Sequence, residues 1–289
     1  MLPKFEILKP ATLAEASAMK KQYGDAARFY AGGTDILVMM REGKMSVEYL
    51  IDIKGLAELK NIKTLECGCL KIGAACTFNE IIANEKIKSD YPELVDGMAR
   101  IGSLQVRNLA TIGGNIANAI PSADSAPCLL IADAKVEIAS AEGIRQVPVC
   151  EFWLGHRKTV LQEGELISAF ILPAKKPNAG AYYYKYTRRK AMDIALFGVG
   201  VYVEMTDGKC TDARVAMATA APTPIRVKEA EEYMIGKALT EEELKQAGEI
   251  AAAAINPRSS VRSSAEYRKQ LAKVLTPRAA AKALSRVKA

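Results

Sequence analysis

The first 55 residues alternate short apolar runs with amphipathic segments, a pattern typical of strands alternating with helices. Strands are predicted at three apolar runs: Phe5–Leu8, Phe29–Ala31 and Tyr49–Ile53. A first helix is predicted after Thr12, which would act as its N-cap, with Glu15 completing a capping box. A second helix is predicted over Ile36–Glu42. This order predicts a small βαβαβ unit.

Beyond Leu65 the pattern changes to short strands and hairpins interleaved with helices, and the Pro- and Lys-rich break at Leu172–Ala181 predicts a domain boundary. After the break we predict strands and then helices: strands at Tyr182–Tyr186, Phe197–Met205 and Ala213–Ala218, a hairpin at Asp207-Gly208, and helices at Arg226–Met234, Glu241–Ala254 and from Glu266 onward. We therefore expect an α+β chain. Its first domain would span residues 1–175, in two parts of about 1–57 and 58–175, and its second domain residues 176–289.

Composition and charge are those of an ordinary globular protein, with 49% hydrophobic residues, 25% charged residues and a net charge of +7. The basic excess is concentrated between Arg258 and Lys288 without basic–aromatic alternation, so we interpret it as a solvated face or a docking surface for an acidic partner, with no nucleic acid bound. The apolar runs are too short to span a bilayer, and MLPKFEILKP lacks the apolar core of a signal peptide. We expect a cytoplasmic location without membrane insertion.

Six cysteines raise the question of a metal site. Cys67 and Cys69 flank Gly68 in LECGCLKIG, which is predicted to form a strand, a tight turn and a second strand. Cys76 follows, but a fourth ligand at suitable spacing is missing and His156 is the only histidine. We therefore interpret these cysteines as thiols of a turn and of the core, and expect no metal or cluster site.

Two Gly-Gly segments carry the candidate chemistry. The first, Ala31-Gly32-Gly33-Thr34-Asp35, separates a predicted strand from a predicted helix, where bare amides and a helix N-terminus can hold phosphate; a plain turn is the alternative. The second, Thr111-Ile112-Gly113-Gly114-Asn115, adds hydroxyl and amide groups that can bond phosphate oxygens or a ribityl chain. Neither matches the Rossmann or P-loop pattern. Together they suggest a dinucleotide with a pyrophosphate, which NAD and FAD both satisfy. Valine at Gly32 or Gly113 is expected to block this ligand while leaving most of the fold intact.

The chain resembles the flavoprotein subunits of the xanthine dehydrogenase and carbon monoxide dehydrogenase family of molybdenum hydroxylases. The resemblance rests on AGGTDILVMMREGK, QVRNLATIGGNIANAIPSADSAPCLLIADAKVEI and KYTRRKAMDIALFGVGV, and it extends from Phe5 through YRKQLAKVLTPRAAAKAL. TIGGN is the most specific motif, with Gln105 and Arg107 before it and Asp124 nine residues past its asparagine. The resemblance implies an α+β fold: a two-part FAD-binding domain of the vanillyl-alcohol-oxidase and CO-dehydrogenase flavoprotein type, followed by a smaller domain of antiparallel sheet and helices.

This resemblance also implies which residues contact FAD. The first loop would wrap the pyrophosphate with the backbone of Ala31, Gly32, Gly33, Thr34 and Asp35. The second loop would meet the pyrophosphate and ribityl region through Thr111, Gly113, Gly114 and Asn115. Asp124 would contact the sugar region of FAD, where a carboxylate can accept ribose hydroxyls away from the diphosphate; an N-cap of the next helix is the alternative.

Further positions are implied to surround the flavin ring. Lys185 matches a lysine near the pyrimidine edge of the isoalloxazine, where a cation stabilises the negative charge that gathers on reduction; a surface lysine in a strand is the alternative. Ile101 and Ile167 match apolar positions beside the ring. The loop Thr187–Ile194 resembles one that approaches the exposed face of the flavin, and here it keeps Asp193 beside basic residues.

The function that the resemblance implies is that of an FAD-carrying electron-transfer subunit. Its implied partners are a molybdopterin-binding large subunit and a [2Fe-2S] small subunit, in a dimer of heterotrimers, with NAD or a quinone as external acceptor. The chain itself is expected to oxidise no organic substrate. A self-contained FAD oxidoreductase of the same superfamily and, from another class, a cofactor-free basic scaffold are the alternatives.

Overall fold

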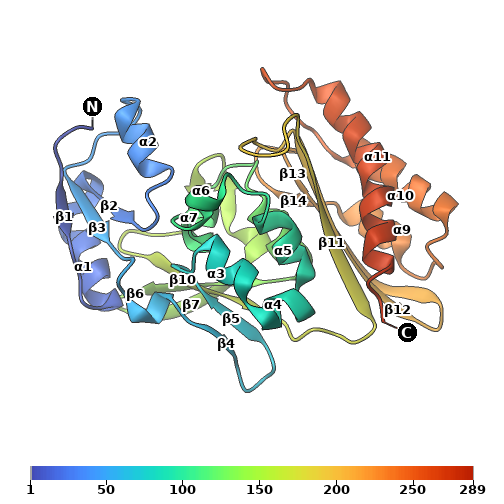
Figure 1. The fold of residues 1–289 in the computed structure, drawn as a ribbon, viewed down its shortest axis with the longest axis horizontal. Helices are drawn as coiled ribbons and strands as arrows, with labels where there is room; N and C mark the ends of the chain where they lie inside the picture. Colours follow the sequence, from blue (N-terminus) through green and yellow to red (C-terminus); the bar gives the residue numbers. More distant parts are fainter. Residues whose placement is uncertain (1, 289) are drawn as a thin grey trace.

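The computed structural model describes residues 2–288, and its three larger sheets lie in a row (Figure 1). A fourth sheet has only two short strands, at residues 153–155 and 158–159. A small N-terminal sheet occupies one end, a five-stranded sheet the middle, and a four-stranded sheet with its long helices the other end. No helix among the described residues is both long enough and apolar enough to cross a membrane.

The N-terminal sheet is parallel, with the order β1-β3-β2. Its strands β1 (Glu6–Leu8), β2 (Ala27–Tyr30) and β3 (Tyr49–Asp52) are joined by α1 (Leu13–Tyr23) and α2 (Ile36–Arg41), which confirms the predicted βαβαβ unit. Thr12 caps α1 by accepting a hydrogen bond from the Glu15 amide at 3.1 Å. The predicted capping box is displaced by one residue, because the Glu15 carboxylate accepts from the amide of Ala11 at 2.7 Å and not from that of Thr12.

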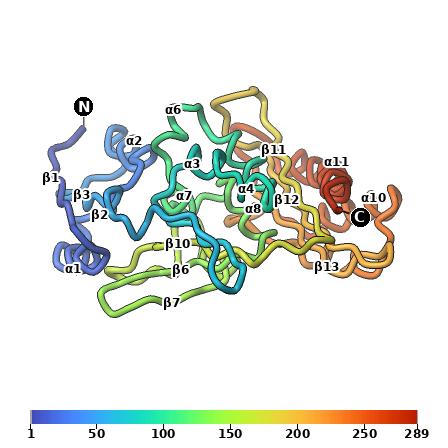
Figure 2. The backbone as a smooth tube through the Cα atoms, turned by 60° about the horizontal axis from the view of Figure 1, so that its bottom comes forward, coloured from blue at the N-terminus to red at the C-terminus, as the bar shows by residue number. Residues whose placement is uncertain are grey.

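The five-stranded sheet is antiparallel and has the order β4-β5-β10-β6-β7. Its strands are β4 (Ile62–Thr64), β5 (Leu70–Gly73), β6 (Lys135–Ser140), β7 (Gly143–Pro148) and β10 (Leu166–Leu172). Between β5 and β6 the chain forms α3 (Phe78–Ala83), α4 (Glu85–Asp90), α5 (Pro92–Met98), α6 (Leu104–Arg107), α7 (Ile112–Ala117) and α8 (Ser125–Ile131). Figure 2 shows α3, α6 and α7 on one side of β6, β7 and β10. The predicted turn between β4 and β5 is confirmed, with Gly68 at φ +79°.

The C-terminal sheet is antiparallel, with the order β11-β12-β13-β14. Its strands are β11 (Ala179–Tyr186), β12 (Phe197–Thr206), β13 (Lys209–Ala218) and β14 (Ile225–Arg226); the helices α9 (Lys228–Met234), α10 (Glu241–Ala254) and α11 (Ala265–Leu284) follow. The predicted hairpin is confirmed, with Asp207 at φ +50° and Gly208 at φ +74°. The helix predicted from Arg226 begins two residues later, because Arg226 belongs to β14 and pairs with Ala216.

The C-terminal sheet packs on both of its faces. Helices α5 and α8 pack on one face and α11 on the other. Figure 1 shows α5 and α11 on opposite sides of β11. The core between this sheet and α9–α11 is separate from the larger core around the five-stranded sheet. Tyr183 of β11 belongs to the larger core, and its hydroxyl lies where a side chain on Gly198 would otherwise be, 2.2 Å from that position. The missing side chain of Gly198 thus lets Tyr183 direct its hydroxyl toward α8.

Candidate functional site

The first glycine loop presents unused backbone donors. Gly33, at φ +70°, turns the chain between β2 and α2. Within residues 2–288, the backbone amides of residues 32–36 donate no hydrogen bond to the protein, and Asp35 makes no side-chain cap to α2. Thr34 is exposed and its neighbours are half-buried. A run of free amides around a left-handed residue is an anion-binding arrangement, so this loop fits a pyrophosphate.

Arg157 adds a cation beside this loop, and apart from its charge nothing in the local sequence pattern points to this role. It lies in the turn between β8 (Trp153–Gly155) and β9 (Lys158–Thr159), at φ +57°. Its guanidinium lies 3.6 Å from the Asp35 carboxylate and donates to the Asn118 side chain at 2.7 Å. The turn therefore places positive charge next to the open amides.

The second glycine loop is built differently, because its backbone amides are already bonded within the protein. The amide of Gly113 donates to the Ala74 carbonyl at 2.9 Å, and that of Gly114 donates to the Thr111 hydroxyl at 3.1 Å. Thr111 thereby caps α7 and is buried. With Ile112 and Asn115 bonded as well, the amides of residues 112–115 are not free to bind a ligand. Asn115 is half-buried, and its carbonyl oxygen accepts from the Ser125 hydroxyl at 2.6 Å.

Close backbone contacts explain two of the glycines. A Cβ on Gly32 would lie 2.0 Å from the Leu109 carbonyl oxygen, and a Cβ on Gly113 would lie 2.7 Å from that of Ala74. Gly32 therefore lets the first loop pack against the segment that leads into the second loop, which brings the two loops together. Valine at Gly32 or Gly113 would therefore disturb the protein locally as well as block the ligand, since both side chains would collide with backbone.

Asp124 and Lys185 form a buried ion pair. Their nearest atoms are 2.8 Å apart, and their side chains are 7% and 3% exposed. Two residues that the sequence did not single out complete the group: the Tyr183 hydroxyl donates to Asp124 at 2.8 Å, and Lys185 donates to the Arg100 carbonyl at 2.8 Å. Burial raises the pKa of the Asp124 carboxyl, and the charge of Lys185 opposes that shift. Lys185 is thus a buried lysine, not a surface one.

Asp124 also occupies the position before α8, but its side chain makes no hydrogen bond to the helix. Asp124 is thus the N-cap residue of α8 by position, as the alternative predicted, but its side chain does not cap the helix. Its carboxylate is directed to β11 instead, where Tyr183 and Lys185 stand two residues apart on the same face of the strand. Strand β11 of the C-terminal sheet thus holds the Asp124 carboxylate in place, through hydrogen bonds from two of its side chains.

The two apolar positions lie in different surroundings. Ile167 is buried in β10, whereas Ile101 is half-buried in the loop before α6, where its carbonyl accepts from Arg107 at 2.9 Å. The loop Thr187–Ile194 approaches this region, because the Met192 amide donates to Gly102 at 3.3 Å.

Asp193 is the one carboxylate in that loop, and the loop itself encloses it. Its carboxylate accepts from the amides of Arg188 and Arg189 and pairs with the Arg189 side chain at 3.2 Å. The Arg189 amide and these further donors lower the pKa of Asp193. Arg188 and Lys190 remain exposed, so the outer surface of this loop is positive.

Metal ligands do not gather in the described part of the chain: residues 2–288 hold no cluster of three or more His, Cys, Asp or Glu side chains suited to a metal ion. Cys76, Cys128 and Cys210 are buried, while Cys67 and Cys150 are exposed.

Comparison with known families identifies this combination of sheets and loops. Residues 3–175 match the FAD-binding domain of molybdopterin dehydrogenases, and residues 182–283 match the C-terminal domain of CO dehydrogenase flavoproteins. The fold and site therefore define an FAD-binding oxidoreductase subunit.

Individual relatives extend along nearly the whole chain. The putative xanthine dehydrogenase FAD-binding subunit of Escherichia coli is 37% identical over 96% of this chain and 95% of its own length. The carbon monoxide dehydrogenase medium chain of Afipia carboxidovorans is 31% identical over the full length of both chains. A solved chain of carbon monoxide dehydrogenase from Hydrogenophaga pseudoflava superimposes with a TM-score of 0.96 at 32% identity, covering both chains completely. This chain belongs to the family of FAD-binding medium subunits of molybdenum hydroxylases, and FAD is its cofactor.

Proposed function

We propose that this chain takes electrons from the iron–sulfur clusters of a partner subunit onto FAD and passes them to an external acceptor, NAD or a quinone. Its partners would be a molybdopterin-binding large subunit and a [2Fe-2S] small subunit, in a dimer of heterotrimers. Residues 1–175 would bind FAD, and residues 176–289 would cover it. The names of the CO dehydrogenase relatives, which are medium chains, support this assembly.

The observation that carries the proposal is the run of free amides at residues 32–36 next to Arg157. A pyrophosphate is the part of FAD with concentrated negative charge, and amides plus a guanidinium supply both hydrogen bonds and charge to it. The second loop would support this contact with the Asn115 side chain and otherwise act as the scaffold beneath it. We retain Ala31, Gly32, Gly33, Thr34, Asp35, Gly114 and Asn115 as the lining of the FAD site, with Thr111 and Gly113 shaping it from behind.

The buried Asp124–Lys185 pair would contribute to the FAD site in a second way. FAD, when bound, supplies two-electron and one-electron transfer. Lys185 would place a cation at the pyrimidine edge of its ring, and Asp124 would hold the ammonium in position while facing the sugar region. Because Asp124 is only 2.8 Å from Lys185, these two contacts must fall on adjoining parts of the cofactor. Ile101 and Ile167 would supply the apolar walls beside the ring.

The test is anaerobic bleaching of the flavin. We expect the isolated, FAD-loaded chain to remain oxidised with purines, aldehydes and N-heterocycles, and to bleach only after the molybdenum and iron–sulfur subunits are added. Dithionite bleaching of the isolated chain is the positive control. Reoxidation of the reduced complex by NAD, compared with reoxidation by a soluble quinone, identifies the acceptor. Bleaching by an organic substrate in the isolated chain would favour the self-contained oxidoreductase.

A further inference from the structure

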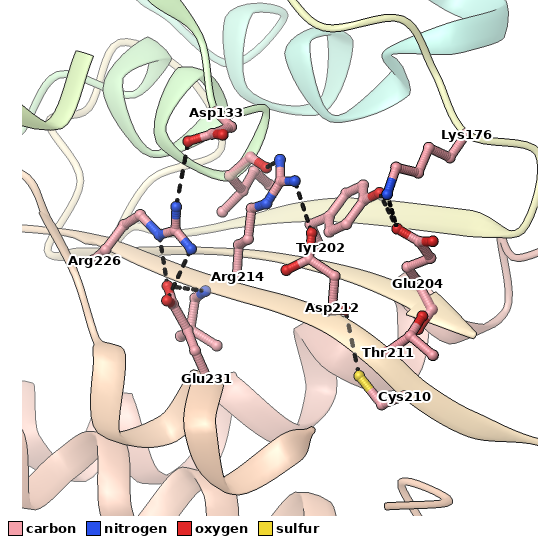
Figure 3. A network of polar contacts seen from close by, with 12 residues as sticks. Asp133, Lys176, Tyr202, Glu204, Cys210, Thr211, Asp212, Arg214, Arg226 and Glu231 are labelled. Carbon is pink, nitrogen blue, oxygen red and sulfur yellow. Dashed lines mark hydrogen bonds and ion pairs between the residues drawn. The ribbon is translucent and has the colours of Figure 1, made fainter. Parts of the chain in front are cut away.

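Two cationic side chains among residues 2–288 are buried, those of Lys185 and Arg268, and their charges are compensated differently. Lys185 has the Asp124 carboxylate beside it. Even the half-buried Arg226 has such a partner, as Figure 3 shows, with Glu231 at 2.7 Å. Arg268 is 6% exposed and pairs with no carboxylate of the described residues, and its Nε atom has no hydrogen-bond partner there. Because a buried cation without a counter-charge costs free energy, the surroundings of Arg268 are short of negative charge.

The guanidinium of Arg268 closes a small hairpin at residues 258–264, which we call the arginine hairpin. It donates to the first carbonyl of the hairpin and, at 2.9 Å, to the Ser260 hydroxyl. Ser260 and Ser263 exchange both of their backbone hydrogen bonds, which places residues 261–262 at the tip. Since these bonds already order the hairpin in the free chain, binding there would cost little conformational entropy.

The arginine hairpin carries cations that have no partner in the described part of the chain. Arg258 and Arg262 are exposed, and neither forms an ion pair within residues 2–288. Burial lowers the pKa of Arg268, and the nearby charges of Arg258 and Arg262 lower it further. Glu266 is the one acidic residue of this segment, and it forms no ion pair with these arginines. The hairpin is therefore a patch of uncompensated positive charge.

Exposed apolar and aromatic side chains lie beside these cations. Val261, at the tip, is 96% exposed, more than any other large hydrophobic residue that the structure describes. Tyr267, in the first turn of α11, is 43% exposed, and its hydroxyl lies 3.0 Å from that of Tyr186 at the end of β11. Figure 1 shows α11 beginning at the end of the sheet where β11 finishes. The loop after Tyr186 adds the exposed cations Arg188 and Lys190. Arginines around exposed apolar and aromatic side chains are typical of protein interfaces.

This surface lies next to the position proposed for the flavin ring. Tyr186 directly follows Lys185 on β11, and Lys185 is the cation proposed at the pyrimidine edge of the ring. A partner seated on the arginine hairpin would therefore stand close to the flavin. Electron transfer between cofactors slows steeply with distance, so the subunit that delivers electrons is the one that has to approach here.

We propose that the arginine hairpin, with Tyr267 and the cations of the loop after β11, is the docking surface for an acidic face of the iron–sulfur subunit. This inference rests on the function proposed above, in which that subunit is the electron donor. Carboxylates of the partner would supply the negative charge that Arg258, Arg262 and Arg268 lack, and Val261 would pack into an apolar depression between them. The positive patch would then be uncompensated only in the free chain.

The experiment measures binding of the FAD-loaded chain to the isolated iron–sulfur subunit, by surface plasmon resonance at 50 mM and 300 mM salt. Arg258→Gln with Arg262→Gln removes two charges from the hairpin. We expect association about tenfold slower than with the parent chain at 50 mM salt, and a smaller difference at 300 mM, because salt screens exposed charges. Val261→Ser should instead speed dissociation about threefold to fivefold at both salt concentrations, because it removes apolar contact area and no charge.

Arg278→Gln with Lys282→Gln is the matched control. It also removes two exposed cations without ion pairs among the described residues, and both lie about 20 Å or more from the start of α11 along the same helix. This control should change the association rate less than about twofold. All of these variants should keep the FAD content of the parent chain, because none of the substituted residues belongs to the proposed FAD site.

Hydrogen exchange locates the docking surface without any substitution. We expect the amides of residues 258–267 to exchange about tenfold more slowly once the iron–sulfur subunit is bound. Slower exchange there with the molybdenum subunit alone, and not with the iron–sulfur subunit, would overturn the proposal. Equal association rates for the hairpin variant and the control variant would also overturn it, while leaving the proposed function intact. If the parent chain neither binds the iron–sulfur subunit nor accepts electrons from it, the proposed function fails and this inference fails with it.

Discussion

The two Gly-Gly loops look alike in sequence and differ in what their backbones do. In the first loop, the amides of residues 32–36 are left without protein acceptors, and Gly33 turns them at a positive φ. In the second loop, Gly113 and Gly114 use their amides to bond Ala74 and Thr111. The first loop is therefore open and suited to a ligand, whereas the second is closed and holds the structure beneath it. A Gly-Gly pair alone does not distinguish these two uses.

The Asp124–Lys185 ion pair is buried in the protein, and removing one of its two partners should have the largest effect on stability. Lys185→Met leaves a buried carboxylate without its cation, which costs about 3–5 kcal/mol of unfolding free energy. Adding Asp124→Asn should recover much of this loss, because the amide carries no charge. Urea denaturation of the single and double variants measures both effects.

The stability loss of the Lys185→Met variant should also depend on pH in a defined direction. Without Lys185, the folded-state pKa of Asp124 rises further above its unfolded value of about 3.9, so the loss is absent below that pH and grows as pH rises toward the folded pKa. A Lys185→Met variant that is as stable as the parent chain at pH 8 would show that the pair is not structural.

Gly113 tests the closed loop directly. Gly113→Val forces a side chain against the Ala74 backbone and should cost about 2–3 kcal/mol, with or without FAD. Gly114→Ala is the matched control, since its Cβ would meet only the Thr111 hydroxyl, at 3.1 Å, and it should change stability by less than about 0.5 kcal/mol. Equal stability losses in the two variants would contradict the assignment of Gly113 to the scaffold.

Arg157 tests the open loop, where we expect an effect on FAD and not on stability. Arg157→Gln removes one exposed charge near the amides and should weaken FAD binding about fivefold, or about 1 kcal/mol. Lys158→Gln removes the same charge from the next residue, which makes no ion pair with Asp35, and serves as the control. Fluorescence titration with FAD measures both. Equal effects would mean that only net charge matters.

Local patterns predicted most of the fold because each element carries its own signal. The start of α10 (Glu241–Ala254) follows from a capping box, and the hairpin at Asp207-Gly208 follows from a turn dipeptide. Strand β14 was missed because two residues have no periodicity. The resemblance named Asp124 and Lys185 separately, but their contact joins residues 61 apart in sequence, which no local pattern reports. Arg157 and Tyr183 were missed for the same reason.

The smallest predicted effect concerns Asp35, whose carboxylate is the one group of the open loop with the wrong sign for a pyrophosphate. It lies 3.6 Å from the Arg157 guanidinium, so it competes with any bound phosphate for that cation. If the loop binds FAD through its amides, Asp35→Asn keeps those amides and removes the competing charge, and FAD should bind about twofold to threefold more tightly at low salt. The gain should shrink at 300 mM salt, because exposed charges are screened over about 6 Å there. Tenfold weaker binding would instead mean that the Asp35 carboxylate itself accepts a hydrogen bond from the cofactor. The open loop would then recognise a hydroxyl group in addition to phosphate.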